Sequence, residues 1–124
     1  MSGSAGLVNV VARVDAAVPI CEVAGEIDAS NVESVLEQLL RSAPEDSPGL
    51  VLDLTRTVYL DSAGVRILFE LARRLRTRRQ ELRIAVPTNG IVRRVLVLTA
   101  LADVVPLHED AADAAAVLRA RVEL

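Results

Sequence analysis

The spacing of apolar residues predicts strands that alternate with helices along this chain of 124 residues. Apolar runs predict strands at residues 7–14, 19–24, 50–55, 82–86 and 104–107. Apolar residues at helical spacing predict a helix after residue 30 that includes residues 32–40, and further helices at residues 65–79, from residue 88 or 89 through 98, and at residues 110–122. Such alternation is typical of an α/β domain. We expect a mixed, mostly parallel sheet of four to five strands, with an N-terminal hairpin and about four packed helices.

Turn and capping residues mark the predicted boundaries. Residues 15–17 form a short turn between the first two strands, and residues 25–28 end the second strand. Asp28 or Ser30 caps the next helix, with Glu33 as the capping-box partner of Ser30. No repeat, linker or second domain is visible, so we expect a flexible segment at residues 1–6 followed by one domain at residues 7–122.

Two residues stand out within the apolar strands. The strand at residues 50–55 is apolar on both faces except for Asp53, which is typical of a strand covered on both sides. Asp53 is expected to accept hydrogen bonds from the backbone or a neighbouring side chain, as a structural group. Cys21 is the single cysteine and is expected to be a small buried hydrophobe.

The amino-acid composition indicates the cellular compartment and the class of protein. Apolar residues make up 52% of the chain and aromatic residues 2%, which favours a packed aliphatic core over a base-stacking surface. One cysteine cannot form an internal disulfide, which favours a reducing, cytoplasmic compartment. No basic residue precedes Arg13, unlike a secretory signal. The longest uncharged apolar runs are far shorter than a membrane span, so we expect no membrane partner.

The charges are unevenly distributed. All 14 basic residues are arginine, which excludes a phosphate-binding loop that ends in Gly-Lys and a Schiff-base lysine. Residues 66–94 hold nine Arg and two Glu, a net charge of +7, whereas the rest holds five Arg and 15 acidic residues, a net charge of −10. This pattern predicts a basic helix surface on an acidic protein, and the net acidity disfavours direct nucleic-acid binding.

Residues 61–64, Asp-Ser-Ala-Gly, are the most informative stretch for function. They follow an apolar strand and open a long helical pattern, so Ser62 lies near the positive end of a helix and its unpaired N–H groups. A phosphate there would add about −1.5 to −2 charges, enough to switch a protein–protein contact. The plainer alternative is that Ser62, or Asp61, only caps the helix.

A second hypothesis is that the chain is a serine hydrolase. Ser62, Asp103 and His108 follow the chain order of an α/β-hydrolase triad. The nucleophile elbow of that fold requires glycine two residues before the serine, where this chain has Leu60. His108 is the only histidine and is expected at the surface or at a strand end. With no second Cys or His beside it, no metal site is expected.

Several segments together resemble STAS domains, and more narrowly the bacterial anti-sigma-factor antagonists. The resemblance rests on residues 51–54 (Val-Leu-Asp-Leu) and 59–65 (Tyr-Leu-Asp-Ser-Ala-Gly-Val), with the turn at residues 25–28 (Gly-Glu-Ile-Asp). Residues 92–96 (Val-Arg-Arg-Val-Leu) and 98–101 (Leu-Thr-Ala-Leu) resemble the later helix of that family. The resemblance lies in the order and spacing of these segments together, and it covers about residues 7–120.

The resemblance implies a non-enzymatic binding switch that needs no cofactor. Its partner would be an anti-sigma factor that is also a serine kinase with a GHKL-type ATP site, and binding it would release a sigma factor. Phosphorylation of Ser62 would end the binding, and a serine phosphatase would restore it. The chain would be a monomer or weak dimer. The implied partner-binding residues are Asp28, Asp61, Ser62, Ala63, Gly64 and Arg66.

One departure from the family pattern affects the site. Ala63 stands where many members have Ser or Thr, which leaves Ser62 as the one hydroxyl of the motif. The alternative is a STAS signalling or scaffold module that binds a nucleotide, a lipid or a partner unrelated to sigma factors. No glycine-rich phosphate cradle is visible, and the sequence does not decide between these readings.

Overall fold

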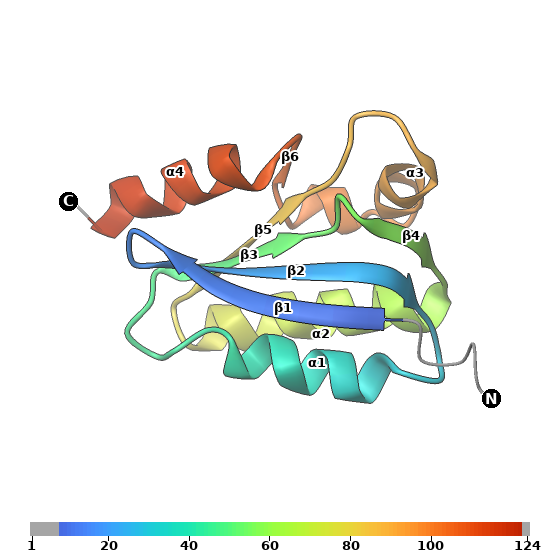
Figure 1. Ribbon diagram of the computed structural model, residues 1–124, viewed down its shortest axis with the longest axis horizontal. Coiled ribbons are helices and arrows are strands. Elements are labelled where there is room, and N and C mark those ends of the chain that lie inside the picture. Colours follow the sequence, from blue (N-terminus) through green and yellow to red (C-terminus); the bar gives the residue numbers. More distant parts are fainter. Residues whose placement is uncertain (1–7, 123–124) are drawn as a thin grey trace.

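The structure of the protein, a computed structural model, describes residues 8–122. A sheet lies at its centre, with helices on both faces (Figure 1). The predicted flexible segment, residues 1–6, lies outside the described residues. In chain order the elements are β1 (Val8–Asp15), β2 (Val18–Ile27), α1 (Val32–Arg41), β3 (Gly49–Asp53), β4 (Thr57–Leu60), α2 (Ser62–Thr77), β5 (Glu81–Ala85), α3 (Ile91–Leu98), the 3-10 helix η1 (Leu101–Asp103), β6 (Leu107–His108) and α4 (Ala111–Val122).

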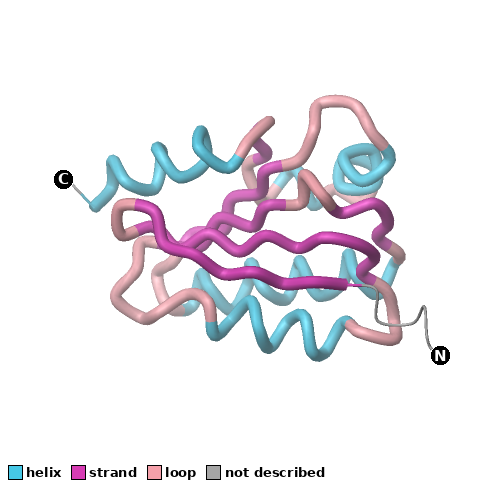
Figure 2. Tube along the Cα trace, viewed as in Figure 1, coloured by secondary structure: helices cyan, strands magenta, loops and turns pink. Residues whose placement is uncertain are grey.

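The sheet is mixed and mostly parallel, which confirms the predicted α/β fold class. Its strand order is β1-β2-β3-β5-β6, and β4 also pairs with β2 (Figure 2). Only the hairpin pair β1–β2 is antiparallel, whereas β2–β3, β2–β4, β3–β5 and β5–β6 are parallel. The sheet of residues 8–122 has six strands, where the sequence predicted four to five, and the added strand is β4.

A bulge at Gly25 allows β2 to pair with two strands on the same side. Ile20 to Glu22 pair with β3, and Gly25 to Ile27 pair with β4, with a register shift between Gly25 and Glu26. Gly25 has φ +105°, a conformation that side chains disfavour and that bulges commonly place on glycine. Strand β2 therefore continues to Ile27. The prediction that residues 25–28 end this strand was wrong.

The last strand is shorter than predicted. The sequence predicted a strand at residues 104–107, but the chain there leaves η1 and pairs with β5 only at Leu107 and His108. Ala100, which precedes η1, has φ +67° and turns the chain. The carbonyls of Pro106 and His108 accept from Ile84 and Val86 N–H, so this edge pairing is brief.

Both faces of the central strand β3 are buried, as predicted. Leu50 and Leu52 belong to the larger core, with α1 and α2, whereas Val51 belongs to a second core under α4. In Figure 1, α1 and α2 lie on one side of the sheet and α4 on the other. Asp53 is buried at the end of β3, and its Oδ1 accepts from Thr55 N (2.9 Å) and Thr55 Oγ1 (2.6 Å), which confirms its predicted structural role.

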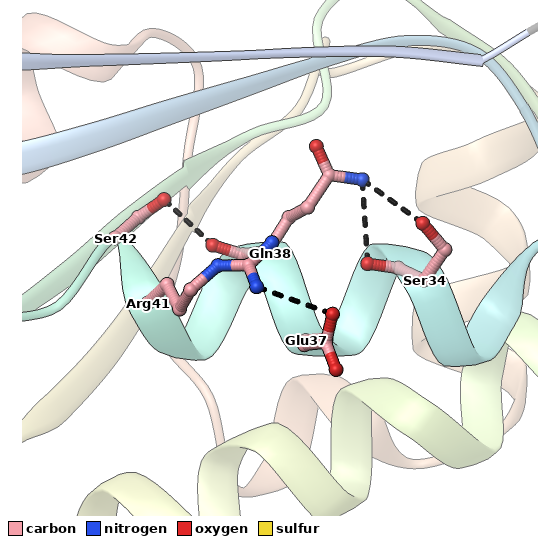
Figure 3. A network of polar contacts seen from close by, with 5 residues as sticks. All are labelled: Ser34, Glu37, Gln38, Arg41 and Ser42. Atoms are coloured by element: carbon pink, nitrogen blue, oxygen red, sulfur yellow. Dashed lines mark hydrogen bonds and ion pairs between the residues drawn. The ribbon is translucent and has the colours of Figure 1, made fainter.

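Polar contacts along the outer side of α1 stabilise the helix that covers β2. Gln38 Nε2 donates to Ser34 Oγ (3.2 Å), and Arg41 pairs with Glu37 at 3.2 Å (Figure 3). Ser42 Oγ donates to the Gln38 carbonyl (2.8 Å) and lies 3.6 Å from Cys21 Sγ. Cys21 is fully buried in the larger core, as predicted. This burial raises the pKa of the Cys21 thiol.

We expect Ala17→Gly to stabilise the protein. Ala16 and Ala17, which join β1 to β2, have φ of +48° and +71°, a region that costs alanine about 1 kcal/mol relative to glycine. Urea unfolding should show a free energy of unfolding higher by about 1 kcal/mol. Ala12→Gly, in exposed strand β1, is the control and should lower it. If both variants lowered the free energy of unfolding equally, this explanation of the turn would be contradicted.

We expect the Cys21 thiol to be protected from alkylation in the folded protein. Burial removes access to the sulfur, and the raised pKa keeps the thiol protonated near neutral pH. Iodoacetamide at pH 7.5 should react at least about a hundredfold more slowly than in urea-unfolded protein. Similar rates in the two states, measured by mass spectrometry, would contradict the burial of Cys21.

Candidate functional site

Asp61 fixes the start of α2 at the carboxyl ends of β2 and β4. It is the N-cap residue, with extended backbone, and its Oδ1 accepts from Gly64 N at 2.9 Å. Its own N–H donates to the Ile27 carbonyl at 3.2 Å. The alternative in which Asp61 caps the helix is therefore confirmed, and Ser62 becomes the first helical residue.

The same carboxylate also holds the loop between β2 and α1. Asp61 Oδ2 accepts from Ala29 N at 3.3 Å, 32 residues earlier in the chain. Within that loop, Asp28 Oδ1 accepts from Ser30 N (2.9 Å) and Ser30 Oγ (2.5 Å). The loop that carries Asp28 and the start of α2 therefore form one surface, with two carboxylates that are already oriented.

The predicted cap of α1 was wrong. Asn31 is the N-cap residue of α1, rather than Asp28 or Ser30, and its side chain makes no cap hydrogen bond. Its Oδ1 accepts from Asp28 N (3.1 Å), and its Nδ2 donates to the Glu26 carbonyl (2.8 Å). The Ser30 hydroxyl is bonded to Asp28, so it does not cap the helix. These polar residues stabilise the loop of the site instead of the helix.

Ser62 is exposed at the first position of α2. Its hydroxyl makes no hydrogen bond with the described residues, because the neighbouring Asp61 already supplies the cap. Backbone N–H groups of the first helical turn lie beside it, and they favour a negative group at this position. The serine is thus accessible and is not needed for the cap of α2.

The other predicted site residues divide into packing and surface positions. Gly64 is buried, and a Cβ there would lie 2.4 Å from Leu60 Cδ1 and 3.1 Å from the Ile27 carbonyl oxygen. Ala63 is half-buried against the larger core. Arg66 is exposed one helical turn after Ser62, on the same side of α2. Gly64 therefore allows the close approach of α2 to β2, and the charged side chain beside Ser62 is Arg66.

The hydrolase arrangement is not assembled. His108 Nε2 lies 3.1 Å from Arg83 Nη1, and no hydrogen bond joins any two of Ser62, Asp103 and His108. Burial, and then the nearby Arg83 charge, lower the pKa of His108. His108 ends β6, as the sequence predicted for a strand-end residue. The contact of His108 is with Arg83, so the three residues do not form the hydrogen-bonded arrangement of a hydrolase triad.

The described residues hold neither a cluster of metal ligands nor a membrane-spanning helix. Between residues 8 and 122, no three His, Cys, Asp or Glu side chains gather as a metal site would require. None of the helices in this part of the chain is long and apolar enough to cross a membrane.

Comparison with known families identifies the fold family. The family model described as STAS domain matches residues 9–114. The chain belongs to the STAS domain family. Among curated proteins, none matches this STAS domain significantly.

Solved structures share the fold of this STAS domain. An anti-sigma factor antagonist from Mycobacterium paratuberculosis has a TM-score of 0.82 and 23% identity, over 94% of this chain and 98% of that one. The anti-sigma factor antagonist SpoIIAA in its unphosphorylated form has a TM-score of 0.60 and 17% identity, over 92% and 97%. An uncharacterized protein from Shewanella loihica with a SpoIIAA-like fold has a TM-score of 0.58 and 16% identity, over 95% and 98%. At these identities the likeness shows the fold.

Sequence reasoning missed an exposed apolar surface beside the site. Val58 on β4 is 63% exposed, and Ile91, Val97 and Leu98 on α3 are 63%, 55% and 73% exposed. We call these four residues the β4–α3 apolar surface. A groove of 920 Å³ runs along α3, with Arg93 and Arg94 in its lining. Of the residues of α3, only Val92 and Leu96 are buried.

We expect Gly64→Ala to destabilise the STAS domain by about 1 to 3 kcal/mol, because the added methyl group would overlap Leu60 and crowd the Ile27 carbonyl. Urea unfolding measures the loss. Arg66→Ala, two residues later on the same helix but exposed, is the control and should change the free energy of unfolding by less than about 0.5 kcal/mol. Equal stability of Gly64→Ala and wild type would contradict the close packing.

Proposed function

We propose that this STAS domain is an anti-sigma-factor antagonist whose binding is switched off by phosphorylation of Ser62. Its partner is an anti-sigma factor with serine-kinase activity, and a serine phosphatase restores the binding form. The observation that carries the proposal is the exposed Ser62 at the first position of α2, directly after the capping Asp61. The folds shared with two anti-sigma factor antagonists support the same general role.

The geometry around Ser62 suits a kinase substrate and a binding surface. Ser62 is free of cap bonds, so a kinase can take its hydroxyl without unravelling α2. Asp28, Asp61, Ser62 and Arg66 present polar groups to the partner, whereas Ala63 and Gly64 position them through packing. The β4–α3 apolar surface adds contact area beside this end of the domain, because β4 leads directly into Asp61.

The switch follows from charge. A phosphate on Ser62 adds about −1.5 to −2 charges next to the carboxylates of Asp28 and Asp61. In the free domain, water and the N-terminus of α2 stabilise this charge. In a packed interface the phosphate loses its water and is repelled by the neighbouring carboxylates. A loss of about 3 to 5 kcal/mol would weaken the complex by roughly 200-fold to several-thousand-fold.

Binding of charge variants tests the proposal. The partner is an anti-sigma factor from the same genome, and calorimetry measures the Kd for each variant. We expect Ser62→Ala to bind within about threefold of wild type, since it removes only a hydroxyl that makes no internal bond. Ser62→Asp adds one negative charge, about half of what a phosphate would add, and should weaken binding at least about thirtyfold.

Thr77→Asp is the matched control, because it adds the same charge at the other end of α2, about 22 Å from Ser62 along the helix. It should bind like wild type. Tight binding by Ser62→Asp would contradict the electrostatic switch. Equal weakening by Thr77→Asp would show that net charge alone, and not position, controls the complex.

A further inference from the structure

A cavity of 570 Å³ lies at the end of the domain opposite Ser62. It forms where the last turns of α2 and α4 approach the start of β5, and Figure 1 shows both helices ending on the same side of the molecule. Arg76, which lines the cavity, follows Ser62 by 14 residues and so lies about 21 Å from the proposed switch along the helix. Its volume lies in the range of sites for small molecules.

The cavity is strongly basic within an acidic protein. Its lining holds Arg76 of α2, Arg79 just after the end of α2, Arg121 of α4 and one acid, Glu81, a net charge of +2. Glu81 is already paired, with Arg121 at 2.8 Å and with Arg83 at 2.9 Å. Arg76 and Arg79 form no ion pair with any residue between 8 and 122. Two guanidinium groups are therefore available to an anionic ligand.

Apolar and neutral polar groups complete the lining. Ala72, Leu82 and Val105 supply apolar surface. Gln80 is 4% exposed, and its Nε2 is held by the Pro44 carbonyl (2.6 Å) and Ser47 Oγ (2.9 Å). Its Oε1 is buried, without a hydrogen-bond partner among the described residues. The cavity combines a cationic rim with an apolar wall, which suits a ligand that has both an anionic and an apolar part.

We propose that this cavity binds a small organic phosphate through Arg76, Arg79 and Arg121. A phosphate monoester carries close to two negative charges near neutral pH, which matches the net charge of the lining. Planar guanidinium groups bind phosphate oxygens in pairs of parallel hydrogen bonds. The organic part of the ligand packs on Ala72, Leu82 and Val105. This site is separate from the proposed partner surface and does not depend on the proposed function.

Calorimetric titration with phenyl phosphate tests the site. We expect saturable binding with a Kd of about 1 mM or tighter, and weaker binding as salt rises. The double variant Arg76→Gln/Arg79→Gln should weaken binding at least about tenfold. Arg73→Gln/Arg74→Gln is the matched control, since it removes the same charge from nearby residues of α2 outside the cavity, and it should bind like wild type.

Three results would overturn the proposal. The first is no saturable binding of phenyl phosphate, and the second is equal weakening in both double variants, which would show attraction to net charge. The third is equally tight binding of a probe that lacks one part of the ligand. Inorganic phosphate that binds as tightly as phenyl phosphate would show that the apolar part contributes nothing, and phenylacetate that does so would show that phosphate is not required. Circular dichroism of each variant confirms that the fold is intact.

Discussion

The carboxylate of Asp61 holds together the end of the STAS domain on which the proposed function depends. One oxygen caps α2 through Gly64 N, and the other accepts from Ala29 N in the loop after β2. A charged acceptor at both positions is stronger than a neutral one would be. Because Asp61 takes the capping role, Ser62 is left exposed and chemically free, so structural and regulatory roles fall on adjacent residues.

The rest of the fold positions this end. Strand β2 pairs first with β3 and then, from Gly25 onward, with the short β4, which leads directly to Asp61. Gly64 allows the first turn of α2 to approach the Ile27 carbonyl at the end of β2. Helix α2 carries a proposed switch at its first turn and an arginine-lined cavity at its last, so two separate surfaces share one rigid element.

Hydrophobic periodicity predicted the elements that bury a face, such as β3 and α2, because burial is what creates the pattern. It missed β4, whose central Val58 and Tyr59 are exposed, so no alternation marks the strand. Periodicity likewise gave no sign that Leu98, an apolar residue of α3, is exposed. The family resemblance named Asp28 and Asp61 as candidate site residues, but the bond from Ala29 N to Asp61 spans 32 residues and required the fold.

Intact-mass spectrometry after incubation with Mg-ATP and each candidate anti-sigma kinase from the same genome tests the central claim most directly. The account predicts addition of a single phosphate, mapped to Ser62 by fragmentation, and none on Ser62→Ala. A kinase that binds the wild-type chain tightly but leaves it unmodified, or modifies another residue, would contradict a switch at Ser62.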